Sequence, residues 1–144
     1  MSILPPSTNA HYAGSPLAAR FLTLVGLLTI GPGLIHTFLP DGGAGVIAGL
    51  DLSSSGAAVI GVFAWAGATQ IVWGTALLVA SLRYRSLVPA LLALVLLERS
   101  LIAANLWLGK AAGSGHHPPA AYATLVALPL IVIALAFSLR GRGR

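Results

Sequence analysis

The stretch LVPALLALVLLERSLIAANLWLG, residues 87–109, decides the fold class, because it is long and apolar yet carries two neighbouring charges, Glu98 and Arg99. A helix needs about 20 apolar residues to cross a bilayer core about 30 Å thick. A charge at the centre of such a helix costs roughly 2.5–3.5 kcal/mol unless a partner or a polar cavity receives it. The stretch therefore predicts a membrane-spanning helix with a candidate functional site near its middle.

The composition of the whole chain agrees with this prediction. Its 144 residues are 57% hydrophobic and only 8% charged, and the mean hydropathy is +0.92. Soluble chains carry about 25% charged residues, so this chain could not cover a water-facing surface. There is no cysteine, which excludes disulfides, thiolate metal sites and cysteine nucleophiles. The basic residues lie at the ends of apolar stretches, which indicates control of topology and argues against nucleic acid as a partner.

Four apolar stretches of suitable length predict an all-α, integral membrane four-helix bundle, flanked by a flexible N-terminal tail (1–16) and a basic C-terminal tail (140–144). The stretches are continuous, whereas the strands of a membrane β-barrel alternate apolar and polar residues. Apolar residues also surround each helix, which argues against a soluble bundle. The predicted membrane domain spans 17–139, and its helices are 17–39, 56–82, 87–109 and 120–139.

The arginines are distributed unevenly between the two ends of these helices. Six arginines fall at one end of the helices, and the basic residue at the other end is Lys110. Because cytoplasmic segments carry the excess of basic residues, we expect both termini in the cytoplasm. The connections 40–55 and 110–119 then lie outside, in a multi-pass protein of a bacterial-type inner membrane. The six arginines at the cytoplasmic end are Arg20, Arg83, Arg85, Arg140, Arg142 and Arg144.

Polar residues inside the helices lie at related depths. Gln70 and Glu98 fall at the centres of their helices, while His36 and Asn105 lie about 10 Å nearer the outer face. If their faces turn inward, they form with Thr29 a polar seam that runs outward from the bilayer centre. The candidate ligand-binding or proton-handling residues are therefore Glu98, Arg99, Gln70, Asn105 and His36.

Arg99 does not share the helix face of Glu98, because successive residues of a helix point about 100° apart. The sequence leaves three surroundings open for its guanidinium. It could bend back to Glu98, enter a polar cavity, or face another protein.

Motifs that would define an enzyme are absent from the sequence. There is no G-x-S-x-G, H-E-x-x-H or P-loop pattern. His36 is the one histidine within the apolar stretches, so a haem held between two histidines is not expected. We predict no catalytic residue, no metal site and no evident cofactor, with a quinone left open. A non-enzymatic role is favoured, although the sequence does not decide it.

Several features recur in a known group. Arg20 enters the first helix, which contains Gly26, Gly31 and Gly33, a long outer loop follows, and the second helix contains ATQIVWG (68–74) before LLVASLRYRS. From Arg20 to Glu98 the chain resembles the DoxX-like group of small four-helix bacterial membrane proteins. The resemblance implies a small membrane subunit, sometimes linked to quinone or sulfur redox complexes. Gln70 stands where the group commonly has a glutamate, and the carboxylate of this chain lies instead at Glu98.

Three functions remain open at this point. The first is a non-enzymatic DoxX-like subunit that binds a partner or a small apolar ligand in the bundle, with the polar seam around Glu98. The second is a proton-coupled transporter of small lipophilic solutes that uses Glu98. The third is a quinone-interacting subunit of a redox complex, with His36 or Glu98 handling protons. The expected partners are the lipid bilayer and a membrane protein or a second copy of the chain.

Overall fold

The computed structural model describes residues 3–109, 115 and 117–140, and its secondary structure is helical. Each of four long helices in this part is long and apolar enough to cross a membrane. This confirms the predicted helices to within two residues at every end. The predicted basic tail is described only at Arg140. The long helices are α1 (Pro16–Phe38), α2 (Gly56–Arg83), α3 (Val88–Trp107) and α4 (Pro119–Leu139), with short 3-10 turns η1 (Asn9–His11) and η2 (Arg85–Leu87).

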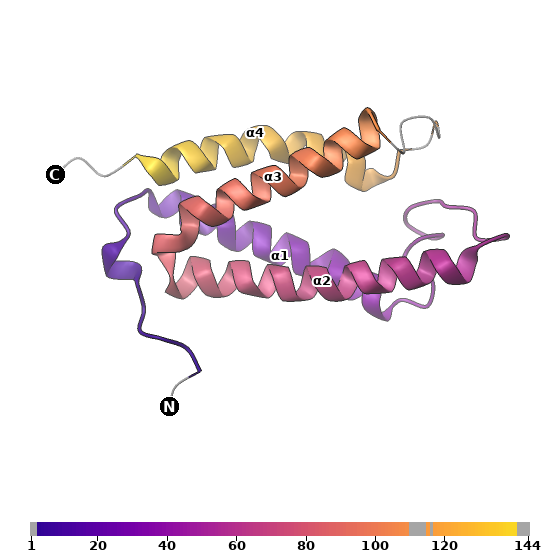
Figure 1. Cartoon of the computed structure of the whole chain (residues 1–144), viewed down its shortest axis with the longest axis horizontal. Coiled ribbons are helices and arrows are strands. Elements are labelled where there is room, and N and C mark those ends of the chain that lie inside the picture. The colour runs from indigo at the N-terminus through magenta and orange to yellow at the C-terminus, as the bar shows by residue number, and fades with distance from the viewer. Residues whose placement is uncertain (1–2, 110–114, 116, 141–144) are drawn as a thin grey trace.

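The helices form two pairs, α1 with α2 and α3 with α4, and the start of α1 and the end of α4 lie at the same end of the molecule (Figure 1). The buried core lies at that end. There, Leu22 and Leu77 of the first pair form one buried cluster with Leu92 and Ile131 of the second pair. Toward the other end the two pairs diverge (Figure 1). The bundle is therefore closed at one end and open between the pairs at the other.

Glycines allow α1 and α2 to pack backbone against backbone. A Cβ atom added to Gly74 would lie 2.7 Å from the carbonyl oxygen of Gly26. One added to Gly67 would lie 2.8 Å from the carbonyl oxygen of Gly33. The two contacts are seven residues apart on each helix, about two turns, so they fall on one face. Small residues are the common means of close helix approach in lipid, and here they hold the first pair together.

The connection after α1 is a compact turn organised by Asp41. Its carboxylate accepts backbone hydrogen bonds from Gly43, Gly45 and Val46 at distances of 2.8, 3.0 and 2.9 Å. These bonds lower the pKa of Asp41 below its ordinary value, and the bond from Val46 has the largest effect. Gly42 and Gly43 adopt positive φ angles of 61° and 76°, which only glycine adopts without strain. The start of the 40–55 loop is thus a defined cap on the open end of the first pair.

The described part of the N-terminal segment contacts the end of α2. The Asn9 side chain donates a 2.7 Å hydrogen bond to the carbonyl of Leu82, and the Thr8 N–H donates one of 3.1 Å to that of Arg83. The last carbonyls of a helix have no donor within the helix, so this segment supplies what α2 lacks. The flexibility expected for residues 1–16 stays a prediction, but these bonds attach the segment to the connection between α2 and α3.

Candidate functional site: a groove beside a charge pair

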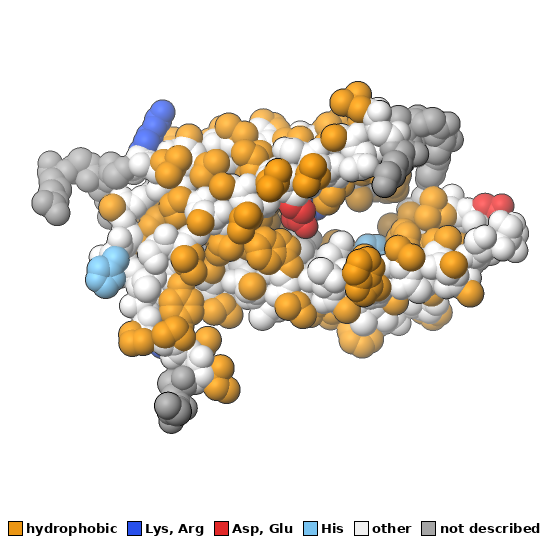
Figure 2. Space-filling view, in the orientation of Figure 1, with side chains coloured by type: hydrophobic (Ala, Val, Ile, Leu, Met, Phe, Trp, Pro, Cys, Tyr) orange, Lys and Arg blue, Asp and Glu red, His pale blue; other side chains and the backbone are white. Residues whose placement is uncertain are grey.

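A groove with a volume of about 740 Å³ separates α2 from α3 near their middles. Figure 2 shows the opening between the two helix pairs on this face, with an acidic side chain at its edge. Leu94 and Glu98 line the groove from α3. The side chains that line it from α2 are Trp65, Ala68, Thr69, Val72, Trp73 and Ala76.

The sequence of α2 explains why a groove forms here. Trp65, Thr69, Trp73 and Ala76 recur at intervals of three and four residues, so they share one face of the helix, and Val72 lies beside Trp73 at its edge. The glycines that contact α1 lie on another face. One face of α2 therefore packs against α1. The face toward α3 combines bulky indoles with small alanines, which leave space between the side chains.

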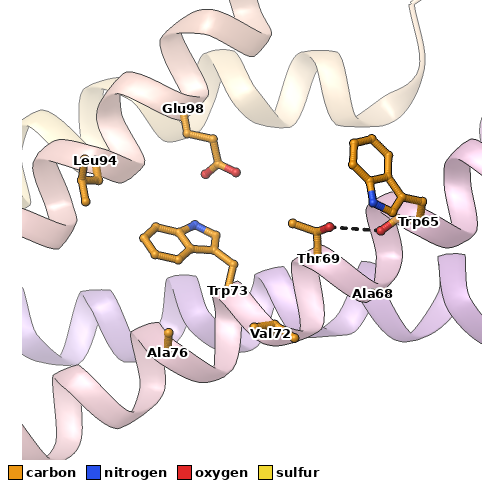
Figure 3. Close-up of a pocket in the computed structure, with 8 residues that line it drawn as sticks. All are labelled: Trp65, Ala68, Thr69, Val72, Trp73, Ala76, Leu94 and Glu98. Carbon is orange, nitrogen blue, oxygen red and sulfur yellow. Dashed lines mark hydrogen bonds between the residues drawn. The ribbon is translucent and has the colours of Figure 1, made fainter.

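Glu98 projects from the middle of α3 into this groove. Its carboxylate points toward Trp73, whose indole nitrogen lies on the ring edge that faces Glu98 (Figure 3). The Oε2 atom is buried and accepts no hydrogen bond from the described residues. A buried acceptor that accepts no hydrogen bond carries a desolvation cost, and a donor or a positive charge that reaches the carboxylate from the groove would reduce it.

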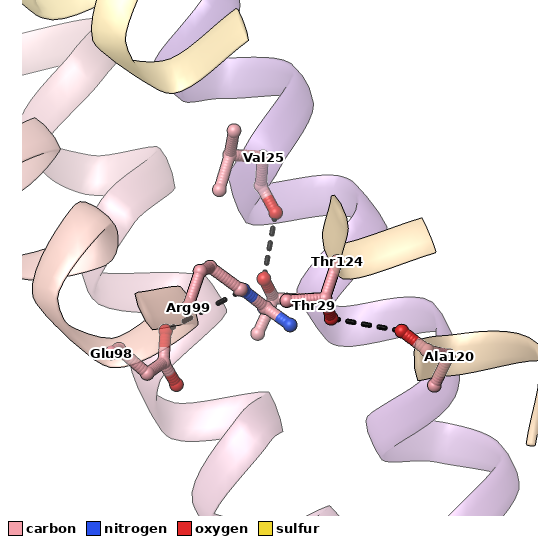
Figure 4. Close-up of polar contacts among 6 residues, drawn as sticks. All are labelled: Val25, Thr29, Glu98, Arg99, Ala120 and Thr124. Carbon is pink, nitrogen blue, oxygen red and sulfur yellow. Dashed lines mark hydrogen bonds and ion pairs between the residues drawn. The ribbon is translucent and has the colours of Figure 1, made fainter. Parts of the chain in front are cut away.

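Arg99 extends from the other side of α3, toward α1 and α4, where Thr29 and Thr124 lie (Figure 4). Its Nε atom is 3.8 Å from Oε2 of Glu98. Each threonine hydroxyl is buried and donates a 2.8 Å hydrogen bond to the carbonyl four residues earlier in its own helix. Their lone pairs thus remain as acceptors on the side of the guanidinium. Of the surroundings left open by the sequence, the structure shows the ion pair with Glu98, and the guanidinium lies on the side of α3 that faces α1 and α4.

The Glu98–Arg99 pair is only partly buried. The exposed fractions of the side chains are 26% for Arg99 and 38% for Glu98. At 3.8 Å the two groups attract without forming a hydrogen bond. Each compensates part of the cost of placing the other within an apolar helix, and the carboxylate stays accessible from the groove.

His36 belongs to the open end of the first pair and not to the groove. Its Nδ1 atom lies 2.6 Å from the carbonyl oxygen of Gly42, so Nδ1 carries the proton and donates. The ring of Phe63 meets the imidazole edge-on, with 5.0 Å between the ring centroids. These contacts explain His36 as a link between α1 and the loop that follows it.

Gln70 and Asn105 are also separate from the charge pair. The Asn105 amide is exposed and donates a 2.9 Å hydrogen bond to the carbonyl of Leu101 in its own helix. Oε1 of Gln70 is buried and has no hydrogen-bond partner among the described residues. No hydrogen bond or ion pair of the described chain connects either residue, or His36, to Glu98. The ion-pair partner of Glu98 is Arg99, which was not part of the expected seam, and Thr29 lies on the Arg99 side of α3.

The groove itself was not predicted. The signal that could have found it is the spacing of Trp65, Thr69 and Trp73, which repeats every four residues beside the alanines of α2. An indole is more often packed in a core, and only the position of α3 shows that these two border an opening.

No group of three histidine or acidic side chains suitable for a metal ion occurs within the part of the chain that the structure describes. Comparisons of the chain with known protein families, with curated proteins and with solved structures find no match. The class of protein is therefore assigned from the fold and the site alone. The protein is an all-helical bundle with four candidate membrane-spanning helices in its described part, and its groove presents one carboxylate.

Proposed function

We propose that this protein is a multi-pass membrane protein that binds a small amphipathic molecule in the groove between α2 and α3. The observation that carries the proposal is the Glu98 carboxylate, which points into an otherwise apolar groove and whose buried Oε2, 3.8 Å from Nε of Arg99, accepts no hydrogen bond. Ligand sites typically combine an apolar lining with a few polar groups that orient the ligand. Glu98 would hold the polar part of the ligand, and the indoles and Leu94 would contact its apolar part.

The outer surface supports a bilayer as the surroundings. Large apolar side chains are exposed along all four helices, including Leu28, Val62, Leu97 and Val126. Exposed apolar area of this extent is unusual in a soluble monomer. The distribution of arginines supports cytoplasmic termini in a bacterial-type inner membrane. The resemblance to the DoxX-like group supports a non-enzymatic subunit.

Fluorescence of the groove tryptophans tests this function. The chain has three tryptophans, and Trp107 does not line the groove, so a Trp107→Phe variant reports from Trp65 and Trp73 alone. This variant, in lipid nanodiscs, is titrated with three probes: neutral decylubiquinone, the tetraphenylphosphonium cation and the tetraphenylborate anion. We expect saturable quenching by at least one probe, above the linear quenching that membrane partitioning produces.

A groove-filling variant shows where the probe binds. Ala68→Leu with Ala76→Leu narrows the groove and should abolish the saturable component. Ala104→Leu adds the same side chain at an exposed position of α3 outside the groove and should leave it unchanged. If no probe gives saturable quenching, or if filling the groove does not affect it, the proposed function is wrong.

A further inference from the structure

We infer that the groove between α2 and α3 selects amphipathic organic cations, such as a protonated amine or a quaternary ammonium with an apolar body. The inference rests on the proposed function and adds the charge of the ligand to it. It is drawn from the juxtaposition of one carboxylate, two indole side chains and an apolar opening.

The charges around the groove favour a positive ligand. Of the described side chains that line it, Glu98 alone is ionisable. Arg99 projects from another side of α3, toward Thr29 and Thr124, and does not line the groove (Figure 4). The ion pair is therefore a local dipole whose negative end faces the groove. A cation would be attracted there, and an anion would be repelled.

The indoles favour a cation as well. Trp65 and Trp73 stand two turns apart on α2 and border the space into which Glu98 points (Figure 3). The face of an indole carries negative charge density, and tryptophan is the best partner for an organic cation. Trp65 is 74% exposed, so its ring is available for contact with a ligand. The hydroxyl of Thr69 already donates to the Trp65 carbonyl at 3.1 Å, which leaves its lone pairs as further acceptors.

The size and setting of the groove suit such a ligand. A volume of about 740 Å³ lies within the range of roughly 300–1,000 Å³ that is usual for small-molecule sites. Leu94, Val72 and the alanines supply an apolar wall. A lipid acyl chain could lie along this wall, but an acyl chain or any other neutral ligand would not use the attraction of the Glu98 carboxylate.

The test compares two probes of similar shape and opposite charge in the Trp107→Phe protein. Tetraphenylphosphonium and tetraphenylborate are titrated in nanodiscs, with protein-free nanodiscs as the correction for partitioning. We expect saturable binding of the cation only. Glu98→Gln, which keeps the shape of the side chain and removes its charge, should weaken cation binding at least about tenfold, because a hydrogen bond or contact to a charged group is lost. Glu98→Asp should retain most of it.

A second pair of variants covers the case in which Glu98→Gln does not fold. Trp73→Leu should weaken the cation several-fold, while Trp73→Phe, which keeps an aromatic face, should weaken it less; Trp65 remains as the reporter in both. Equal binding of cation and anion, or a cation preference that survives both Glu98→Gln and Trp73→Leu, would overturn the inference and leave the proposed function standing. If the Trp107→Phe protein with an unaltered groove binds none of the probes saturably, the proposed function itself is wrong.

Discussion

Glu98 and Arg99 are neighbours in the chain, but they meet different parts of the molecule. Glu98 points into the groove beside α2, while Arg99 points toward α1 and α4 and returns its Nε atom to within 3.8 Å of the carboxylate. One residue step in a helix places them about 100° apart, which is why one charge can serve a ligand while the other is held within the bundle.

Single and double substitutions should show this mutual compensation. Arg99→Met leaves the Glu98 carboxylate without its partner and should destabilise the protein. Removing one partner of a fully buried ion pair costs roughly 3–5 kcal/mol, and since both side chains here are partly exposed we expect a smaller loss of about 2 kcal/mol. The combination Glu98→Gln with Arg99→Met should recover most of that loss, as measured by thermal unfolding in mild detergent.

A double variant that is as unstable as the sum of its single variants would contradict this account. Arg99→Lys serves as a control, because it keeps the positive charge. It should retain more stability than Arg99→Met, although it loses the planar guanidinium that extends toward Thr29 and Thr124.

The helices α1 and α2 form a unit that depends on close approach of their backbones. Gly26 with Gly74 and Gly33 with Gly67 are the points of contact. Not every glycine of these helices takes part, since a Cβ atom on Gly31 or Gly61 would meet nothing within 4 Å. The role of a glycine in this bundle therefore depends on its face and not on its presence in an apolar stretch.

Two glycines of α2 provide a matched comparison. Gly67→Ala would place a methyl group 2.7 Å from Oγ1 of Thr37 and 2.8 Å from the Gly33 carbonyl oxygen, so α1 would have to move. Overpacking of this kind typically costs roughly 1–3 kcal/mol. Gly61→Ala meets open space and should be neutral or stabilising by up to about 1 kcal/mol, because alanine favours the helix.

The melting temperatures of the two variants in the same detergent check this prediction. Gly74→Ala should behave like Gly67→Ala, because its methyl group would lie 2.7 Å from the Gly26 carbonyl oxygen. If Gly67→Ala unfolds no earlier than Gly61→Ala, the two helices do not approach as closely as the structure shows.

At the scale of the molecule, the two helix pairs are joined at one end and separate toward the other. The joined end contains the buried core, the connection through η2 and the hydrogen bonds from the N-terminal segment. The groove lies beyond that core, where the two helix pairs diverge (Figure 1). The site thus depends on a closed end that holds the pairs together without filling the space between them.

The expected orientation in the membrane can be measured because the chain has no cysteine. Ser54→Cys places a single thiol in the 40–55 loop, and Ser86→Cys places one at the connection between α2 and α3. Both positions are exposed. With cytoplasmic termini, a membrane-impermeant maleimide should label Ser54→Cys in intact spheroplasts and Ser86→Cys only after permeabilisation. The reverse pattern would show that the protein is inserted the other way.

The sequence by itself determined the four helices and the depth of the charges within them. Continuous apolar stretches of membrane-spanning length leave the helix as the structure that satisfies every backbone group in lipid, so the bounds of α1 to α4 followed from hydropathy alone. The 100° step between Glu98 and Arg99 was likewise a local consequence of helix geometry.

Only the tertiary structure decided what those side chains meet. The helices are apolar on every side, so hydropathy could not show which face of α2 packs against α1 and which borders the groove. That choice follows from backbone contacts between Gly26 and Gly74 and between Gly33 and Gly67, which bring together residues far apart in the chain. Once α1 and α2 are paired in this way, Trp65 and Trp73 border an opening that Glu98 enters, and His36 and Asn105 are left outside it.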